Sequence, residues 1–349
     1  MAASIVSPQL ESPVIVGGSP SSGSTLLRVL CGRHPRFRTG GELHVFDHSP
    51  LFETRGAEFT RTARTCLARG VPRSYASLVD WLFNDHDDWG WRRDELLPLI
   101  NASSSWSELL MTFFARSEID GHRTRWLEKT PENVFGYAQA RNGFRDASFI
   151  HTMRDGRDVV ASLTARGHSI FRAATRWYCA TLAGLALGDH PDVIHVSYEA
   201  LVRDPSQQMA VVLGRLGEEY DPAVLETDPN ARPLIGSWRS AEYGDVSDRS
   251  IGRLRDEDVD AVAAVFSAIR LSDDGYELLD RARLPTATST VWASASNATD
   301  LLALMGYECQ RGRRLRPSER SAIRMELDAF QVGQRARYGI VRACCPTTI

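Results

Sequence analysis

The sequence predicts an α/β fold with a P-loop-like, three-layer architecture, in which a central parallel sheet is flanked by helices. Short apolar runs rich in β-branched residues occur at 13–17, 147–153 and 193–197, and each has the length of a buried strand. Segments with helical spacing of apolar residues follow these runs, and strands that alternate with helices are typical of a parallel sheet. The Gly/Ser-rich segment 17–25, at the end of the first run, gives the fold its P-loop-like start.

The remaining elements follow in chain order. Residues 125–128 are expected to add a short strand, and Pro131 is expected to open a helix, because proline is tolerated in the first helical turn. Polar stretches at 42–53 and 228–253 indicate loops. Further helices are expected at 25–33, 158–166, 171–188, 199–203, 205–216 and 256–269.

Composition divides the chain into two parts. Residues 11–284 are expected to form the main domain, and residues 57–117 within it have the pattern of a helical insertion. Ser, Thr and Ala are frequent at 285–297, a composition that favours a linker. We therefore expect 285–349 to be a linker followed by a helical C-terminal extension.

Charge and composition argue against several classes of protein. The chain has 349 residues and a formal net charge of −3, so it lacks the basic balance of a nucleic-acid binder. No apolar run has the length needed to span a bilayer, and residues 1–10 lack the basic and apolar regions of a secretory signal. The six cysteines show neither zinc-ligand spacing nor a disulfide framework. We therefore expect a cytoplasmic protein that uses no metal and binds neither nucleic acid nor membrane; its oligomeric state is left open.

The chain contains a single lysine, Lys129, among its 41 basic residues. A GC-rich genome explains the many arginines, but it does not explain why one lysine is kept. An ammonium is a compact point charge, whereas a guanidinium is a planar fork. Lys129 is therefore either a surface lysine that happens to survive or a residue whose role arginine cannot fill.

Two strand–turn–helix segments carry phosphate-binding chemistry. In the first, Gly18 and Gly23 have the Gly-x4-Gly spacing of a nucleotide P-loop, and such a loop directs backbone N–H groups and a helix N-terminus at a phosphate. Ser24 stands where that motif has the lysine that binds outer phosphates, which argues against an ATPase or GTPase. In the second, Arg154 ends a strand at the edge where open α/β sheets bind ligands, and Ser162 follows about two helical turns later. A flexible turn and a locally ion-paired polar turn are the simpler accounts of the two segments.

The combination resembles the PAPS-dependent sulfotransferases, in the branch of the tyrosylprotein sulfotransferases and their bacterial relatives. That branch carries a Pro-Arg-Ser-Gly-Thr-Thr-Leu loop, and this chain has Pro-Ser-Ser-Gly-Ser-Thr-Leu at 20–26. It also carries an Arg-Asp-Gly-Arg element with a serine eight residues past its first arginine, matched at 154–162, and a Lys-Thr-Pro element, matched at 129–131. The resemblance covers roughly residues 14–252.

The resemblance implies that 3′-phosphoadenosine-5′-phosphosulfate (PAPS) is the co-substrate. It implies that Arg154 and Ser162 hold the 3′-phosphate and that Tyr198 contacts the nucleotide, although a tyrosine at the core edge is the simpler account of Tyr198. A late loop resembles one that covers the cofactor, through Ser250, Gly252 and Arg253. The cradle of the 5′-phosphosulfate would be the loop of Gly18, Ser19, Ser21, Ser22, Gly23, Ser24 and Thr25.

The resemblance also implies the catalytic groups. Glu42 lies 22 positions after Pro20, the spacing at which the tyrosylprotein branch has its general base, and His44 is the second choice. Lys129, aided by N–H groups of 22–25, would stabilise the charge on the leaving phosphate oxygen. The acceptor would carry a hydroxyl group.

The chain departs from the family at Ser21, where relatives have arginine or lysine. That cation would stabilise the transferring sulfuryl group, so its absence leaves open a non-catalytic protein that binds PAPS. A P-loop kinase or NTPase is the less favoured alternative.

Aromatic residues of the insertion give two readings of the acceptor. They could line a pocket for an apolar or aromatic acceptor, or they could pack helices against one another. The residues are Trp81, Phe83, Trp89, Trp91, Trp106, Phe113 and Phe114.

Overall fold

The computed structural model describes most of the chain. The described residues are 12–46, 54–69, 87–115, 125–226, 246–270 and 295–308, with 312, 314–315, 317–318 and 320–321. Trp81, Phe83, most of the loop predicted at 228–253 and nearly all of the linker predicted at 285–297 lie outside these residues.

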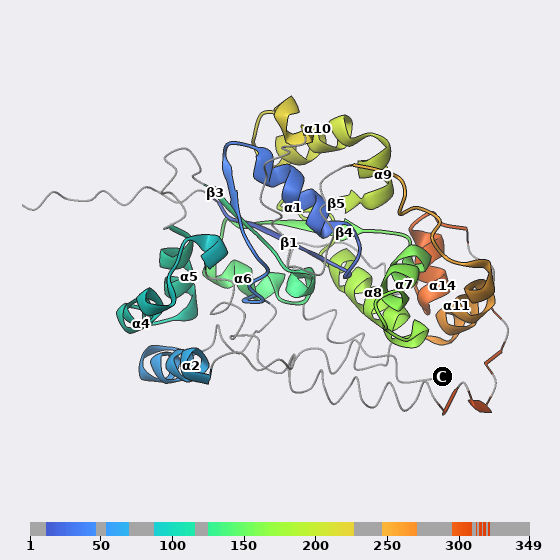
Figure 1. Ribbon diagram of the computed structural model, residues 1–349, viewed down its shortest axis with the longest axis horizontal. Coiled ribbons are helices and arrows are strands. Elements are labelled where there is room, and N and C mark those ends of the chain that lie inside the picture. The colour runs from blue at the N-terminus through green and yellow to red at the C-terminus, as the bar shows by residue number, and fades with distance from the viewer. Residues whose placement is uncertain are drawn as a thin grey trace, which may run out of the picture.

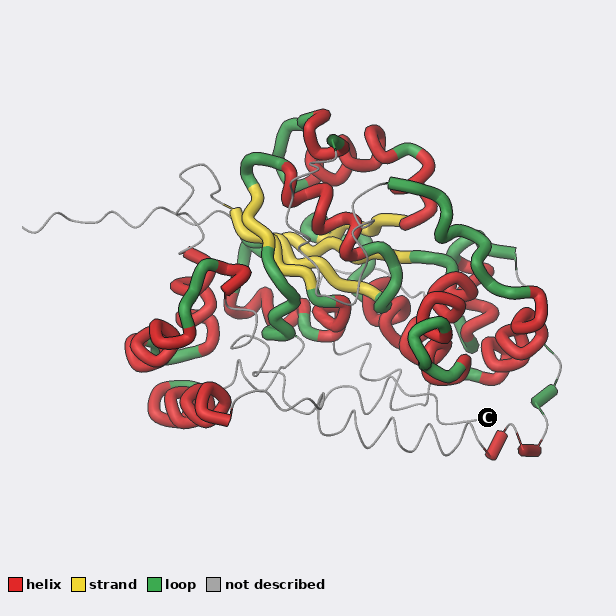
Figure 2. The backbone as a smooth tube through the Cα atoms, viewed as in Figure 1, coloured by secondary structure: helices red, strands yellow, loops and turns green. Residues whose placement is uncertain are grey.

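The centre of the molecule is a five-stranded sheet in which all neighbouring strands run parallel (Figures 1 and 2). Its order is β2-β3-β1-β4-β5. The predicted fold class is thereby confirmed. The strands are β1 (Val14–Gly18), β2 (Phe37–Thr39), β3 (Arg125–Lys129), β4 (Ser148–Met153) and β5 (Val193–Ser197).

Helices cover both faces of this sheet (Figure 1). One face carries α1 (Ser24–Arg33), α9 (Tyr198–Arg203) and α10 (Pro205–Arg215). The opposite face carries α6 (Tyr137–Gly143), α7 (Gly156–Thr164) and α8 (Ile170–Leu185). Next to α8 lie α11 (Asp256–Ala268) and α14 (Ala298–Leu304), and short 3-10 helices occur at Asp87–Trp89, Pro131–Phe135 and Pro222–Leu225.

Two helix predictions need correction. Pro131 opens the 3-10 helix Pro131–Phe135, and the α-helix begins only at Tyr137. The helix predicted from 158 begins at Gly156, because the carboxylate of Asp155 accepts the N–H of Arg157 and caps the first turn.

Side chains alternate between the two faces of β3, and this alternation separates its last two residues. Leu127 belongs to the apolar cluster under α1, whereas Trp126 belongs to the cluster on the opposite face. By the same alternation, the side chain of Lys129 lies on the α1 side of the sheet, and that of Glu128 leaves the strand on the opposite side.

The helical insertion consists, in its described part, of α2 (Gly56–Arg69), α4 (Arg93–Ala102) and α5 (Trp106–Ala115). Phe114 of α5 stacks on Trp126 of β3 with ring centroids 3.8 Å apart, and Trp91 stacks on Phe113 at 5.6 Å. Trp89, Trp91, Trp106, Phe113 and Phe114 are all buried in this packing, as expected if they pack helices against one another. An apolar or aromatic acceptor stays a prediction. Among the described residues, no helix is both long and apolar enough to cross a membrane.

Candidate active site

The loop between β1 and α1 has a backbone shape that requires glycine at two positions. Gly18 and Gly23 have positive φ angles of 151° and 92°. A Cβ on Gly18 would lie 2.4 Å from the carbonyl oxygen of Thr152, and one on Gly23 would lie 2.4 Å from the ring of Tyr198. The loop is therefore pressed between the ends of β4 and β5, where an open parallel sheet places its ligand site.

Ser22 fastens this loop internally. Its hydroxyl donates to the carbonyl of Ser19 at 2.6 Å and lies 2.7 Å from the hydroxyl of Thr152. Its backbone N–H also donates to the Ser19 carbonyl, at 3.1 Å, so the Ser22 N–H expected to face a phosphate is engaged within the loop. The N–H groups left to face a ligand are those of the first turn of α1, which have no intrahelical acceptor.

Lys129 is buried, with 1% of its surface exposed, so the reading of a chance surface lysine is wrong. Its Nζ donates to Oγ1 of Thr25 in the first turn of α1, at 3.1 Å, and to the carboxylate of Glu42. The single lysine thus joins the first turn of α1 to Glu42, the residue predicted to be the base. The Glu42 side chain keeps 28% of its surface exposed, so a proton acceptor beside the buried ammonium faces solvent.

A buried carboxyl group, Glu128, positions the segment that carries Glu42 and His44. It accepts the N–H of Leu43 at 3.0 Å, the hydroxyl of Thr130 at 2.7 Å and the amide of Asn133 at 2.6 Å. Burial raises the pKa of Glu128 above its usual value. No local pattern indicates this role, because Glu128 and Leu43 lie 85 positions apart.

His44 sits in a strained backbone conformation, with φ of 54°. Its N–H donates to Oγ1 of Thr130 at 3.2 Å, and its Nε2 lies 3.9 Å from Oε2 of Glu42. The structure therefore brings together the three residues predicted to be catalytic, Glu42, His44 and Lys129.

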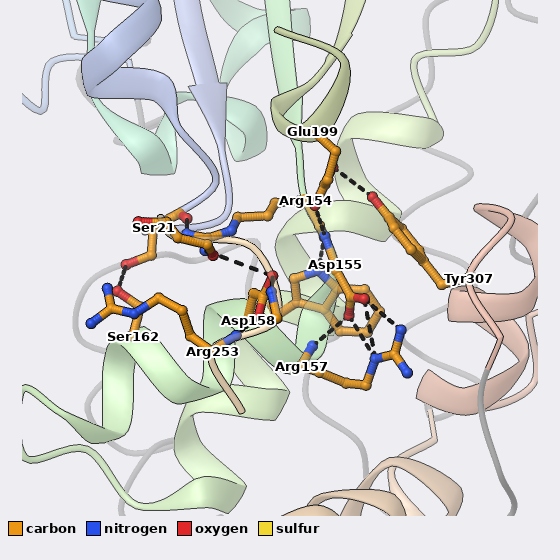
Figure 3. Close-up of polar contacts among 12 residues, drawn as sticks. Ser21, Arg154, Asp155, Arg157, Asp158, Ser162, Glu199, Arg253 and Tyr307 are labelled. Carbon is orange, nitrogen blue, oxygen red and sulfur yellow. Dashed lines mark hydrogen bonds and ion pairs between the residues drawn. The ribbon is translucent and has the colours of Figure 1, made fainter. Parts of the chain in front are cut away.

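Arg154 lies at the C-terminal end of β4 and reaches three separate segments (Figure 3). Its Nη1 donates to the carbonyl of Ser21 at 2.9 Å and its Nη2 to the carbonyl of Ser250. Its guanidinium carbon lies 4.5 Å from the ring centroid of Tyr198, a cation–π contact. The Nε atom is buried and has no hydrogen-bond partner among the described residues, as expected of an arginine that binds an anion.

The loop of Ser250, Gly252 and Arg253 is held over this arginine by Asp158 of α7. One carboxylate oxygen accepts the N–H of Gly252 at 2.9 Å, and the other accepts the N–H of Arg253 at 2.6 Å. The structure thus brings the predicted late loop to Arg154, and it adds Asp158, which sequence reasoning missed.

Ser162 also reaches the loop between β1 and α1. Its hydroxyl donates to the hydroxyl of Ser21 at 3.2 Å, as Figure 3 shows. Ser21 has a left-handed φ of 69°. Its hydroxyl also accepts a hydrogen bond from Nη2 of Arg166, a residue that the sequence analysis did not single out.

The end of β4 is fixed by side chains on α8 and α9, and one of these is held in turn by Tyr307. Trp177 of α8 donates its indole N–H to the carbonyl of Arg154 at 3.0 Å. Glu199 accepts the N–H of Asp155 at 2.9 Å and the hydroxyl of Tyr307 at 2.8 Å (Figure 3). Residues near the C-terminal end of the described chain therefore support the site.

A group of cationic side chains borders the site at the start of α8. Burial and the charges of Arg176, Arg172 and Arg166 lower the pKa of His168 to about 4. Arg176 pairs with Glu132 at 2.6 Å. Although burial alone raises the pKa of Glu132, the charges of Arg176 and His44 bring that pKa below its usual value.

Comparison with known proteins identifies the group to which this site belongs. A family model described as the sulfotransferase family matches residues 13–222, more than half of the chain. A search of curated proteins finds no match.

Two solved structures align with this chain, and the first of them supports the fold. A sulfotransferase domain from the curacin biosynthetic pathway aligns over 86% of this chain and 100% of its own, with 16% identity and a TM-score of 0.50. The sulfotransferase domain of the Synechococcus PCC 7002 olefin synthase aligns over 67% of this chain and 84% of its own, with 22% identity and a TM-score of 0.47.

Proposed function

Since the chain belongs to the sulfotransferase family, we propose that it moves a sulfuryl group from PAPS to the hydroxyl group of an acceptor. The observation that carries this proposal is the position of Lys129. Its ammonium contacts both the first turn of α1 and the carboxylate of Glu42. A helix N-terminus, a cation and a carboxylate therefore meet at one point, as the proposed transfer requires.

The residues present suit the donor. The first turn of α1 offers N–H groups and a positive helix end to the 5′-phosphosulfate. Arg154, with its unpartnered buried Nε, and Ser162 suit the 3′-phosphate. Tyr198 packs against both the loop and Arg154, so the nucleotide would lie beside its ring.

The reaction needs one proton acceptor and one stabilising cation. Glu42 takes the proton of the acceptor hydroxyl while the acceptor oxygen bonds to sulfur. The bond between sulfur and the phosphate oxygen breaks, and Lys129 stabilises the negative charge that develops on that oxygen. In-line placement of the three groups supplies the rest of the rate enhancement, as in phosphoryl transfer.

The alternative is a protein that binds the donor without transferring its sulfuryl group, and Ser21 is the observation that favours it. The branch of the tyrosylprotein sulfotransferases stays a prediction. A kinase or NTPase is disfavoured, because the position of the P-loop lysine is Ser24.

The first experiment compares ligands by thermal stabilisation. We expect 3′-phosphoadenosine-5′-phosphate to raise the melting temperature and ATP with magnesium to leave it unchanged; the reverse result would support the kinase reading. Arg154→Ala should weaken 3′-phosphoadenosine-5′-phosphate far more than adenosine-5′-phosphosulfate, which lacks the 3′-phosphate. Equal losses for the two nucleotides would remove Arg154 from the 3′-phosphate site.

The second experiment separates transfer from binding. Labelled PAPS is incubated with the protein and a panel of hydroxyl compounds, and the label is followed into the acceptor. Binding of PAPS without transfer to any acceptor, and without Lys129-dependent hydrolysis, would support the non-catalytic alternative.

A further inference from the structure

The hydroxyl of Ser21 is the meeting point of two side chains from one end of α7. Ser162 donates to it at 3.2 Å, and Arg166 donates to it through Nη2. Arg166 also donates through Nε to the carbonyl of Ser162 at 3.3 Å. A guanidinium therefore lies directly on the position at which relatives carry a cationic side chain.

The backbone explains how Arg166 reaches the loop. Residues 162 and 166 are four apart, so they share one face of a helical turn. The chain stays in that turn beyond α7, since the N–H of Arg166 donates to the carbonyl of Leu163 at 3.0 Å, and Gly167 ends it with φ of 87°. The face that directs Ser162 to the loop therefore directs Arg166 there as well.

Two guanidinium groups thus hold a single loop residue from different elements. Arg154, before α7, donates to the carbonyl of Ser21, and Arg166, after α7, donates to its hydroxyl. With Ser162 between them, these groups form a cationic rim around position 21.

Further positive charge lies next to this rim. Burial, and then the charges of Arg176, Arg172 and Arg166, lower the pKa of His168 to about 4, so that imidazole is uncharged at neutral pH. Arg176 is paired with Glu132 at 2.6 Å. The guanidinium of Arg166, by contrast, lies on the Ser21 hydroxyl, where an anion bound by the loop would meet it.

We propose that Arg166 binds the anionic sulfuryl donor at position 21 and thereby supplies, from the end of α7, the positive charge that Ser21 lacks. The inference rests on the proposed function, because the donor is the anion concerned. It assigns to the site a residue outside the loop and accounts for the missing loop cation without loss of activity.

Arg166→Ala tests the contact directly. Binding of 3′-phosphoadenosine-5′-phosphate, measured by calorimetry, should weaken about 10- to 100-fold, the effect of one charge-assisted hydrogen bond. The matched control is Arg172→Ala, which removes an equal charge six residues further along the chain; it should weaken binding less than about threefold. Both arginines are exposed, and the melting temperature without ligand verifies that each variant folds.

A second test returns a positive charge to position 21 of the loop and looks for a gain in affinity instead of a loss. In the Arg166→Ala background, Ser21→Arg should restore most of the lost affinity and turnover, because the cation returns to the loop. In the parent, Ser21→Arg should raise neither affinity nor turnover, since the new guanidinium and that of Arg166 would compete for the same place.

Three results would overturn the inference: unchanged binding in Arg166→Ala, equal losses in Arg166→Ala and Arg172→Ala, or no rescue by Ser21→Arg. A different result would contradict the proposed function itself: a parent protein that does not bind 3′-phosphoadenosine-5′-phosphate at all. If the parent binds this nucleotide, Arg154→Ala does not and Arg166→Ala still does, then the proposed function stands and the role of Arg166 is wrong.

Discussion

Lys129 Nζ lies 3.1 Å from Oγ1 of Thr25, across 104 positions of sequence, and the same ammonium holds the carboxylate of Glu42. The contact joins the end of β3 to the first turn of α1. Thr25 is thus the link through which a phosphate bound at the helix end would meet the lysine.

Lys129→Ala should lower turnover by at least about 100-fold, the effect of removing one donor to a developing charge. Lys129→Arg should rescue little, because the planar fork does not fit the place of a compact ammonium with 1% of its surface exposed. Steady-state transfer of labelled sulfate measures both. A Lys129→Ala variant as active as the parent would exclude the lysine from the mechanism.

Glu42→Gln should keep nucleotide affinity and lower turnover by about 10²–10⁴-fold, because the amide cannot take a proton. His44→Ala is the comparison, since its Nε2 lies 3.9 Å from the carboxylate. Calorimetry gives the affinity and labelled transfer gives the rate. If turnover survives Glu42→Gln and is lost only in His44→Ala, then His44 is the base.

Glu128→Gln should reduce the free energy of unfolding by about 1–3 kcal/mol, the cost of an unsatisfied buried polar group. The three donors of Leu43, Thr130 and Asn133 match a carboxylate, and an amide NH₂ in its place would face a donor. Urea denaturation measures the loss. Glu257→Gln, at an exposed position of α11, is the control, and an equal loss in both would argue against a special role for Glu128.

His168 predicts a specific dependence of stability on pH. Its pKa in the folded protein is about 4, mainly through burial and then the charge of Arg176, against about 6.5 in the unfolded chain. Between these values the unfolded chain binds more protons, so the free energy of unfolding falls as the pH falls from 6.5 to 4. His168→Gln should lose less stability across this interval than the parent.

Denaturant titrations at pH 7 and pH 4.5 test this difference, and equal losses in the two proteins would contradict it. The same imidazole reports on its neighbours. Arg166→Ala removes one of the charges that lower its pKa, so the NMR titration midpoint of His168 should rise.

Three of the five strands, β1, β4 and β5, could be predicted because they are apolar runs set between turns and helices. A fourth, β3, was predicted although only Trp126 and Leu127 of its residues are apolar. The strand β2 was missed, since Phe37–Thr39 has three residues with an arginine at its centre and shows no period. The sequence alone could not decide whether the aromatic residues of the insertion line an acceptor pocket or pack helices. Their burial depends on partners such as Trp126 that lie elsewhere in the chain.

The candidate site divides in the same way. Lys129, Arg154 and the glycine loop stand at strand ends, and strand ends of a parallel sheet converge on one edge, so their meeting could be foreseen. Asp158 contacts backbone N–H groups 94 and 95 positions away, and Arg166 reaches a loop 145 positions before it. Such contacts leave no local pattern, because only the tertiary fold decides which backbone groups a side chain meets.

The two backbone contacts of Arg154 hold its guanidinium in place before any anion arrives. Nη1 donates to the carbonyl of Ser21 and Nη2 to that of Ser250, while the buried Nε has no partner among the described residues. A guanidinium that is already oriented loses little side-chain entropy when it binds a phosphate. Shortening the segment near Ser250 so that its carbonyl no longer reaches Arg154 should therefore weaken nucleotide binding, because the side chain must then be ordered at the cost of binding energy.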